Sequence, residues 1–171
     1  SNPDIVVAAM TGDIFKANTE RGVFKSVDGG KTWKKTLYLS DQVGAMDVEF
    51  QPGNPGVVYA WMSRLERKPW TIISGGREGG FYKSTNGGDS FTKISMGLPS
   101  ELIGKGNLAT TAANPNPIYA LVAANPGGGL YRSDHAGQPL APAPSTPALG
   151  PPPLCSPPPP PRPTPPGGPS P

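Results

Sequence analysis

The sequence predicts an all-β fold, consisting of about two and a half four-stranded blades of a β-propeller, followed by a disordered proline-rich tail. Three observations support this prediction: a threefold internal repeat, short β-prone runs between glycine-rich turns, and an abrupt change of composition after Gly137. Seventeen of the 25 prolines lie in the last 34 residues. We therefore predict two domains, a propeller fragment over 1–137 and a low-complexity tail over 138–171.

Three short motifs recur in the same order along the first domain. The first is Asn-Pro followed by a β-branched run, at 2–9, 54–61 and 114–121. The second is a glycine, two apolar residues, a basic residue and a serine, in the forms GVFKS, GFYKS and GLYRS. The third starts at that serine and reads SVDGGKTW, STNGGDSF and SDHAGQPL. Repetition at this spacing indicates stacked supersecondary units of one kind.

Each unit reads as a group of short strands. In the second unit the β-prone runs at 57–61, 80–83 and 90–94 are bounded by turn residues, and a fourth run follows at 107–111. The run at 45–50 takes the fourth position in the first unit. No segment offers ten residues of helical periodicity free of glycine and proline. Four short strands per unit are typical of a propeller blade, although the first unit lacks its opening strand and the third its last.

The third motif resembles the Asp-box, or bacterial neuraminidase repeat, with the pattern Ser/Thr-x-Asp-x-Gly-x-Thr-Trp/Phe. A short Asx side chain can bond the N–H groups that a hairpin turn leaves unpaired, and paired glycines allow the positive φ of a tight turn. We therefore interpret these residues as turn braces, with the aromatic residue packed into the sheet. An asparagine in the second copy supports this, because an amide cannot act as a general base. The residues are Ser26, Asp28, Gly30, Thr32 and Trp33 in the first copy, Ser84, Asn86, Gly88, Ser90 and Phe91 in the second, and Ser133 and Gly137 in the third, where His135 replaces the aspartate.

Together with their flanks, GVFKSVDGGKTWKK and GFYKSTNGGDSFTK are similar to the propellers of sortilin and the vacuolar sorting receptors. They are more similar still to bacterial proteins with that propeller, often labelled glycosyl hydrolase. The resemblance covers residues 1–137. It implies a binding or interaction module, a piece of a larger propeller without activity of its own, with a protein, peptide or carbohydrate ligand and an extracytoplasmic location. The alternative is a fragment of a xyloglucanase-like propeller glycoside hydrolase that acts on polysaccharide; a cofactor-assembly scaffold is a third class that carries the motif.

The second unit contains an insertion, residues 63–79, which we predict to be a long loop between two strands of one blade. Its basic and aromatic side chains can stack on a sugar ring or pair with an acidic peptide. The alternative interpretation is that its tryptophan packs back on its own blade. The candidate ligand residues are Arg64, Arg67, Lys68 and Trp70.

Charge and residue counts exclude several functions. The first domain carries 14 Lys and Arg against 12 Asp and Glu, without a dense basic run, so we predict no nucleic-acid binding. Cys155 lies in the tail and His135 is the one histidine, so we predict no metal site and no cofactor. No apolar run approaches the ~18 residues that span a bilayer.

No catalytic residue is assigned. A glycosidase needs two carboxyl groups across a substrate groove. Asp47 and Glu49 alternate with apolar residues, and we interpret them as a solvated strand face.

The tail consists almost entirely of Pro, Ala, Leu, Ser, Gly and Thr. That composition is what GC-rich DNA read in a shifted frame would give. A true polyproline II linker is the competing interpretation.

Overall fold

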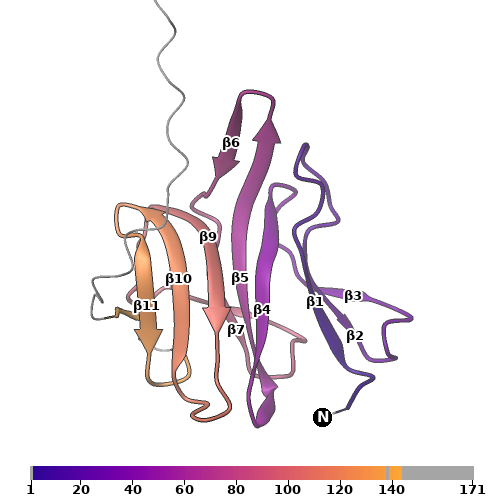
Figure 1. The fold of residues 1–171 in the computed structure, drawn as a ribbon. Helices are drawn as coiled ribbons and strands as arrows, with labels where there is room; N and C mark the ends of the chain where they lie inside the picture. The colour runs from indigo at the N-terminus through magenta and orange to yellow at the C-terminus, as the bar shows by residue number, and fades with distance from the viewer. Residues whose placement is uncertain (1, 138, 144–171) are drawn as a thin grey trace, which may run out of the picture.

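Twelve β-strands form three antiparallel sheets in the computed structural model, which describes residues 2–137 and 139–143 (Figure 1). Within these residues there is no helix, and hence none that could span a membrane. Sheet 1 contains β1 (Val6–Met10), β2 (Gly22–Ser26) and β3 (Lys34–Leu37). Sheet 2 contains β4 (Val43–Gln51), β5 (Asn54–Lys68), β7 (Gly80–Ser84) and β8 (Thr92–Ile94), with β6 (Thr71–Ser74) paired to β5. Sheet 3 contains β9 (Leu102–Ala109), β10 (Ile118–Asn125), β11 (Gly129–Ser133) and β12 (Ala141–Pro142).

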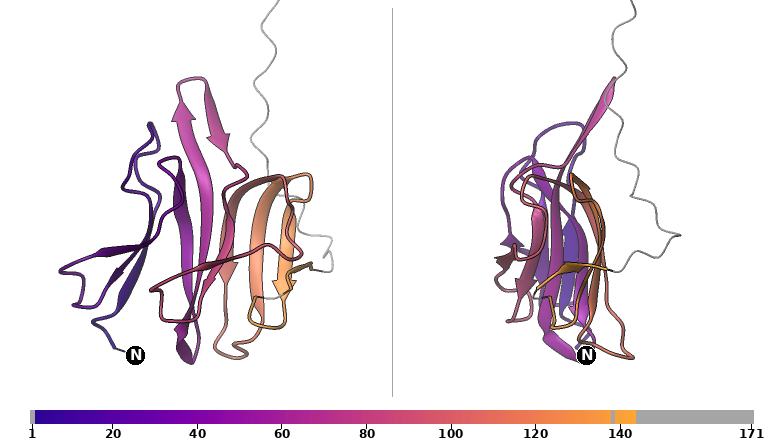
Figure 2. Two further views of the ribbon diagram at one scale, coloured as in Figure 1. Left: turned by 180° about the vertical axis from the view of Figure 1, so that it is seen from behind. Right: turned by 90° about the vertical axis from the view of Figure 1, so that its left-hand side faces the viewer.

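The three sheets follow one another in chain order, with sheet 2 in the middle (Figures 1 and 2). The contact between neighbouring sheets repeats: β4, the first strand of sheet 2, lies against β1 and β2, and β9, the first strand of sheet 3, lies against β4, β5 and β7. Sheet 1 has no equivalent first strand among the described residues. The predicted all-β repeat is thus observed as three units that stack in the same way.

Alternation along the strands of sheet 2 divides the core into two layers. Tyr59, Trp61 and Phe81 are fully buried against sheet 3. Ala60 and Met62, the intervening residues of β5, are fully buried against sheet 1. Since both faces of β5 are covered, its central run is continuously apolar instead of alternating with polar residues.

The predicted loop at 63–79 is wrong for much of its length. Residues 63–68 continue β5, and Thr71–Ser74 return as β6, with Leu65 opposite Ser74 and Lys68 opposite Thr71. The charged residues at 64–68 are not β-prone by themselves, so the sequence did not predict a strand there. They form one by pairing with the β-prone residues of β6, which come later in the chain. The resulting hairpin, residues 64–75, projects beyond the rest of sheet 2 (Figure 1); we call it the arm.

Two other boundaries differ from the prediction. The run expected at 107–111 is β9, which starts earlier, at Leu102, because Leu102, Ile103 and Gly106 also pair with β10, across a shift of register. The third unit does have a last strand, the two-residue β12, and Leu140 before it is 1% exposed. The β-structure therefore extends past Gly137, where the domain boundary was predicted. Most of the predicted tail, residues 144–171 with Cys155, lies outside the described residues.

Candidate functional site

A serine, an Asx residue and a glycine close the turn between β2 and β3. Ser26 Oγ accepts the N–H groups of Asp28 and Gly30 at 3.3 and 2.8 Å and donates to Asp28 Oδ1 at 2.7 Å. The Asp28 carboxylate accepts the N–H of Thr32 at 2.9 Å and its hydroxyl at 2.5 Å. These bonds satisfy backbone N–H groups that the chain reversal leaves without strand partners.

The second turn repeats this pattern with an amide. Ser84 Oγ accepts the N–H of Gly88 at 2.9 Å, and Asn86 Oδ1 accepts the N–H of Ser90 at 3.0 Å. The Asn86 amide donates to the Ser90 hydroxyl at 2.9 Å, where the first turn has an acceptor. Asn86 therefore makes the same contacts as Asp28 with one difference. Its side chain donates to the Ser90 hydroxyl, whereas the Asp28 carboxylate accepts from the Thr32 hydroxyl.

Among the described residues of the third turn, only the serine bonds are retained. Ser133 Oγ accepts the N–H groups of His135 and Gly137 at 3.3 and 3.0 Å. Ala136 stands where the other turns have glycine, at a φ of 52°, which costs an alanine about 1 kcal/mol.

The residue at the aromatic position of each turn is buried to a degree set by the preceding sheet. Leu140 is 1% exposed in the layer between sheets 2 and 3, and Phe91 packs partly buried between sheets 1 and 2. Trp33 is 45% exposed, and its indole N–H donates to Gly30 O at 3.0 Å. The expectation that Trp33 packs into the sheet is therefore wrong, because no sheet of the described chain precedes sheet 1.

Hydrogen bonds from Thr32 and Ser26 lower the pKa of the Asp28 carboxyl from 3.8 to about 2. Because the folded-state pKa is depressed, the bonds contribute fully above pH 3.8 and are lost as the pH falls through about 2. We expect an NMR titration of the Thr32 amide to show a midpoint near 2 and the Ser90 amide, bonded to Asn86, to show no transition there. A Thr32 midpoint at or above 3.8, or an equal transition at Ser90, would contradict this prediction.

In the first two units a basic side chain reaches the turn of the next unit. Lys25 Nζ, 9% exposed, binds Asp89 Oδ1 at 2.8 Å, and Lys83 Nζ donates to Ala136 O at 2.8 Å. Arg132, the equivalent residue of the third unit, binds Asp134 of its own turn instead, at 2.5 Å. The sequence shows this basic position in GVFKS, GFYKS and GLYRS, but no role was predicted for it. Its repetition in all three units was the one feature that pointed to a structural role.

Asp47 joins sheets 2 and 3. Its two carboxylate oxygens accept the N–H groups of Val48 at 2.9 Å and Leu108 at 2.7 Å. Glu49 is half-buried, and burial, with the Asp47 charge as a second cause, raises its pKa. The expected solvated face is wrong for both, since β9 packs against this part of β4.

The arm carries the four residues predicted as ligand contacts. Glu66 binds Arg64 at 3.4 Å and also binds Lys68, and these bonds lower the pKa of its carboxyl. Arg67 is exposed, and Trp70, between the two strands at the tip, is 76% exposed. The structure thus places all four on one hairpin and keeps Trp70 off the sheet.

Arg21, which sequence reasoning missed, fixes the base of the arm. It is 1% exposed and donates to the carbonyls of Asp13 at 2.5 Å, Lys16 at 3.3 Å and Leu65 at 3.3 Å. The N–H of Arg67 also donates to Ile14 O at 2.7 Å. The 11–20 segment, which connects β1 to β2, therefore covers one edge of the arm.

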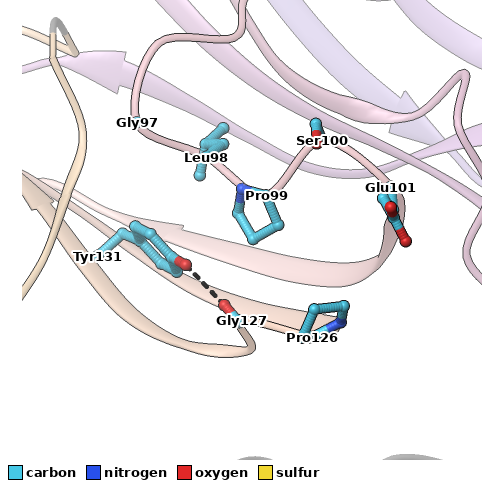
Figure 3. A pocket seen from close by; sticks show the side chains of 8 residues that line it. All are labelled: Gly97, Leu98, Pro99, Ser100, Glu101, Pro126, Gly127 and Tyr131. Atoms are coloured by element: carbon cyan, nitrogen blue, oxygen red, sulfur yellow. Dashed lines mark hydrogen bonds between the residues drawn. The ribbon is translucent and has the colours of Figure 1, made fainter.

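Two hollows lie around sheet 3. One, of about 400 Å³, is bordered by the 97–101 loop and the β10–β11 turn, where Tyr131 donates to Gly127 O at 2.6 Å (Figure 3). The other, of about 440 Å³, lies between β6 and the β9–β10 pair. We call the second one the arm groove. Its lining residues are Ile72, Ile73, Ser74, Gly75, Leu102, Gly104, Lys105, Ala123, Ala124 and Asn125.

The fold matches solved propeller glycoside hydrolases. An ancestral GH74 enzyme is 18% identical over 81% of this chain, with a TM-score of 0.53. The GH74 xyloglucanase from Xanthomonas campestris is 21% identical over 74% of this chain, with a TM-score of 0.52. This chain spans 18% of the length of each of them. No family model and no curated protein matches the sequence.

These likenesses, together with the three stacked sheets, define an all-β partial β-propeller and confirm the predicted fold class. At this identity a shared fold does not transfer an activity.

Proposed function

We propose that this chain is a binding module, a piece of a larger propeller without activity of its own, and that the arm is its recognition element. The observation that carries the proposal is Trp70, 76% exposed at the tip of a hairpin whose base is held in place by buried Arg21. Tryptophan offers a large contact area at low conformational cost, and a firmly based projection keeps that area in position.

The turns fit this proposal as structural elements. Their hydrogen bonds suit the bracing role of an Asp-box. The turn of sheet 2 lies at the opposite end of that sheet from the arm, since Ser84 pairs with Val58 near the start of β5. Kinship with the sortilin-like propellers is part of the same proposal and rests on the sequence motifs.

The experiment compares two exposed tryptophans. We expect Trp70→Ala to weaken binding of the chain to at least one of two probes, soluble xyloglucan or an acidic peptide, by tenfold or more, about 1.4 kcal/mol. Trp33→Ala is the matched control, because Trp33 is also exposed but lies on the first turn. Binding is measured by affinity electrophoresis for the polysaccharide and by fluorescence anisotropy for the peptide. The proposal fails if neither probe binds at millimolar concentration or if both substitutions act equally.

The GH74 likeness favours a second candidate, a fragment of a polysaccharide hydrolase. Asp47 and Glu49, on β4, are its candidate carboxyl pair, but both Asp47 oxygens already accept backbone N–H groups. We expect no release of reducing sugar from xyloglucan. Release that Asp47→Asn abolishes would favour the hydrolase.

A further inference from the structure

One edge of β6 has no strand partner among the described residues. Gly75 donates its N–H to Arg64 O at 2.9 Å, so the alternation of the antiparallel ladder directs the backbone groups of Ile72 and Ser74 away from β5. The next outward residue, Gly76, is bridged to Ile103 of β9 by two N–H···O bonds of 3.0 and 3.3 Å. Beyond that bridge β6 pairs with no described strand except β5. Two N–H and two C=O groups are therefore presented in a row.

The arm groove lies along this edge. Four consecutive residues, 72–75, line it. Since successive side chains of a strand point to opposite faces, a consecutive run marks the backbone edge as the border of the groove. The other wall contributes the small residues Gly104 and Ala123, and at its base Gly104 lies close to Gly75. Ile72 and Leu102, 40% and 52% exposed, add apolar surface.

Apolar residues and glycine make up most of the groove lining, and its three polar side chains, Ser74, Lys105 and Asn125, include no acid. Lys105 is exposed, is the one charged residue in the lining, and has no carboxylate within 4 Å among the described residues. Arg67 is exposed on the neighbouring strand of the arm. A ligand with a carboxylate complements this charge.

We propose that the arm groove binds an extended peptide, which adds a strand to the free edge of β6 and presents an acidic side chain to Lys105. The two outward residues of β6 donate and accept up to four backbone bonds, and the bridge at Gly76 fixes where the added ladder starts. An apolar residue of the peptide covers Ile72 and Leu102. The inference rests on the proposed binding function and names its ligand class, a peptide rather than a polysaccharide.

The probe is an acetylated, amidated eight-residue peptide of alternating threonine and valine with one central aspartate, titrated into the full chain. We expect the amides of Ile72 and Ser74 to gain protection from hydrogen exchange while Ile73, already bonded to β5, is unchanged. A peptide with N-methyl groups on alternate residues cannot complete the ladder and should bind at least tenfold more weakly. Binding that leaves the exchange of Ile72 and Ser74 unaltered would overturn the proposal.

Two substitutions test the ladder and the charge separately. Ser74→Pro removes an outward N–H but no bond to β5, and is expected to weaken binding at least tenfold while exchange at Ile73 reports that the arm is folded. Lys105→Glu should weaken binding of the aspartate peptide by a similar factor and strengthen binding of a peptide in which lysine replaces the aspartate. Lys31→Glu, an exposed site on the first turn, is the control and should change neither affinity.

The outcomes distinguish failure of the peptide site from failure of the binding function. If xyloglucan binds through Trp70 and the peptide does not bind at millimolar concentration, the peptide site is wrong and the binding function stands. If neither binds, both fail.

Discussion

Replacement of Trp61 by alanine is expected to destabilise the chain by about 3–5 kcal/mol, the range for large aromatic residues deleted from a core. Trp61 has no exposed surface, and its indole N–H donates to Gly104 O at 3.0 Å across the layer between sheets 2 and 3. A Cβ built on Gly106 would lie 2.2 Å from the indole ring, so the backbone of β9 rests directly on it. The deletion therefore removes both packing and a bond that join two sheets.

Urea unfolding followed by circular dichroism measures this loss. Trp61→Phe retains most of the ring but not the N–H, and should cost less than the alanine variant. Trp33→Ala, at an exposed position, should change the free energy of unfolding by less than about 0.5 kcal/mol. An equal effect of Trp61→Ala and Trp33→Ala would show that sheets 2 and 3 are not joined as described.

Loss of Arg21 is expected to cost more than about 2 kcal/mol and to loosen the arm. Its guanidinium binds the carbonyls of Asp13, Lys16 and Leu65 in a buried site, and each carbonyl left without a donor costs about 1–3 kcal/mol. Arg21→Lys provides a single point charge in place of the planar fork and should recover only part of the loss.

Hydrogen exchange locates the effect of Arg21→Ala. The Arg67 amide, which binds Ile14 O at 2.7 Å, should exchange faster in the variant, whereas the Leu108 amide, bonded to Asp47, should not. Uniform acceleration at both amides would indicate global destabilisation without a specific role at the arm. Because Arg21 is remote from the tip, weaker ligand binding in this variant would reflect the position of the arm.

Local sequence was informative where one residue type sets local geometry. Gly29 and Gly87 have φ values of 71° and 69°, and the serine–Asx bonds join residues two to four positions apart. Such bonds need no distant partner. The repeat therefore indicated the turns, the all-β class and the stacking of like units before any sheet was known.

The same reasoning failed where the partner lies far along the chain. The strand at 63–68 is stabilised by pairing with β6 and by contacts with the 11–20 segment. Neither interaction can be predicted from the charged residues of the strand itself. The sequence predicts a solvent-facing Asp47, but in the structure the Leu108 N–H of β9 donates to Asp47 Oδ2 at 2.7 Å. Leu140 read as part of the tail because its burial depends on sheet 2.

The sequence by itself determined a repeated β-unit with glycine-braced turns and a change of composition near Gly137, because these depend on bonds within a few residues and on composition. Only the tertiary structure decided that Arg64, Arg67, Lys68 and Trp70 stand on a paired arm, and that β6 has a free edge beside a groove. Strand pairing joins residues without regard to their separation along the chain. The candidate binding surface is therefore a property of the packed sheets rather than of any one motif.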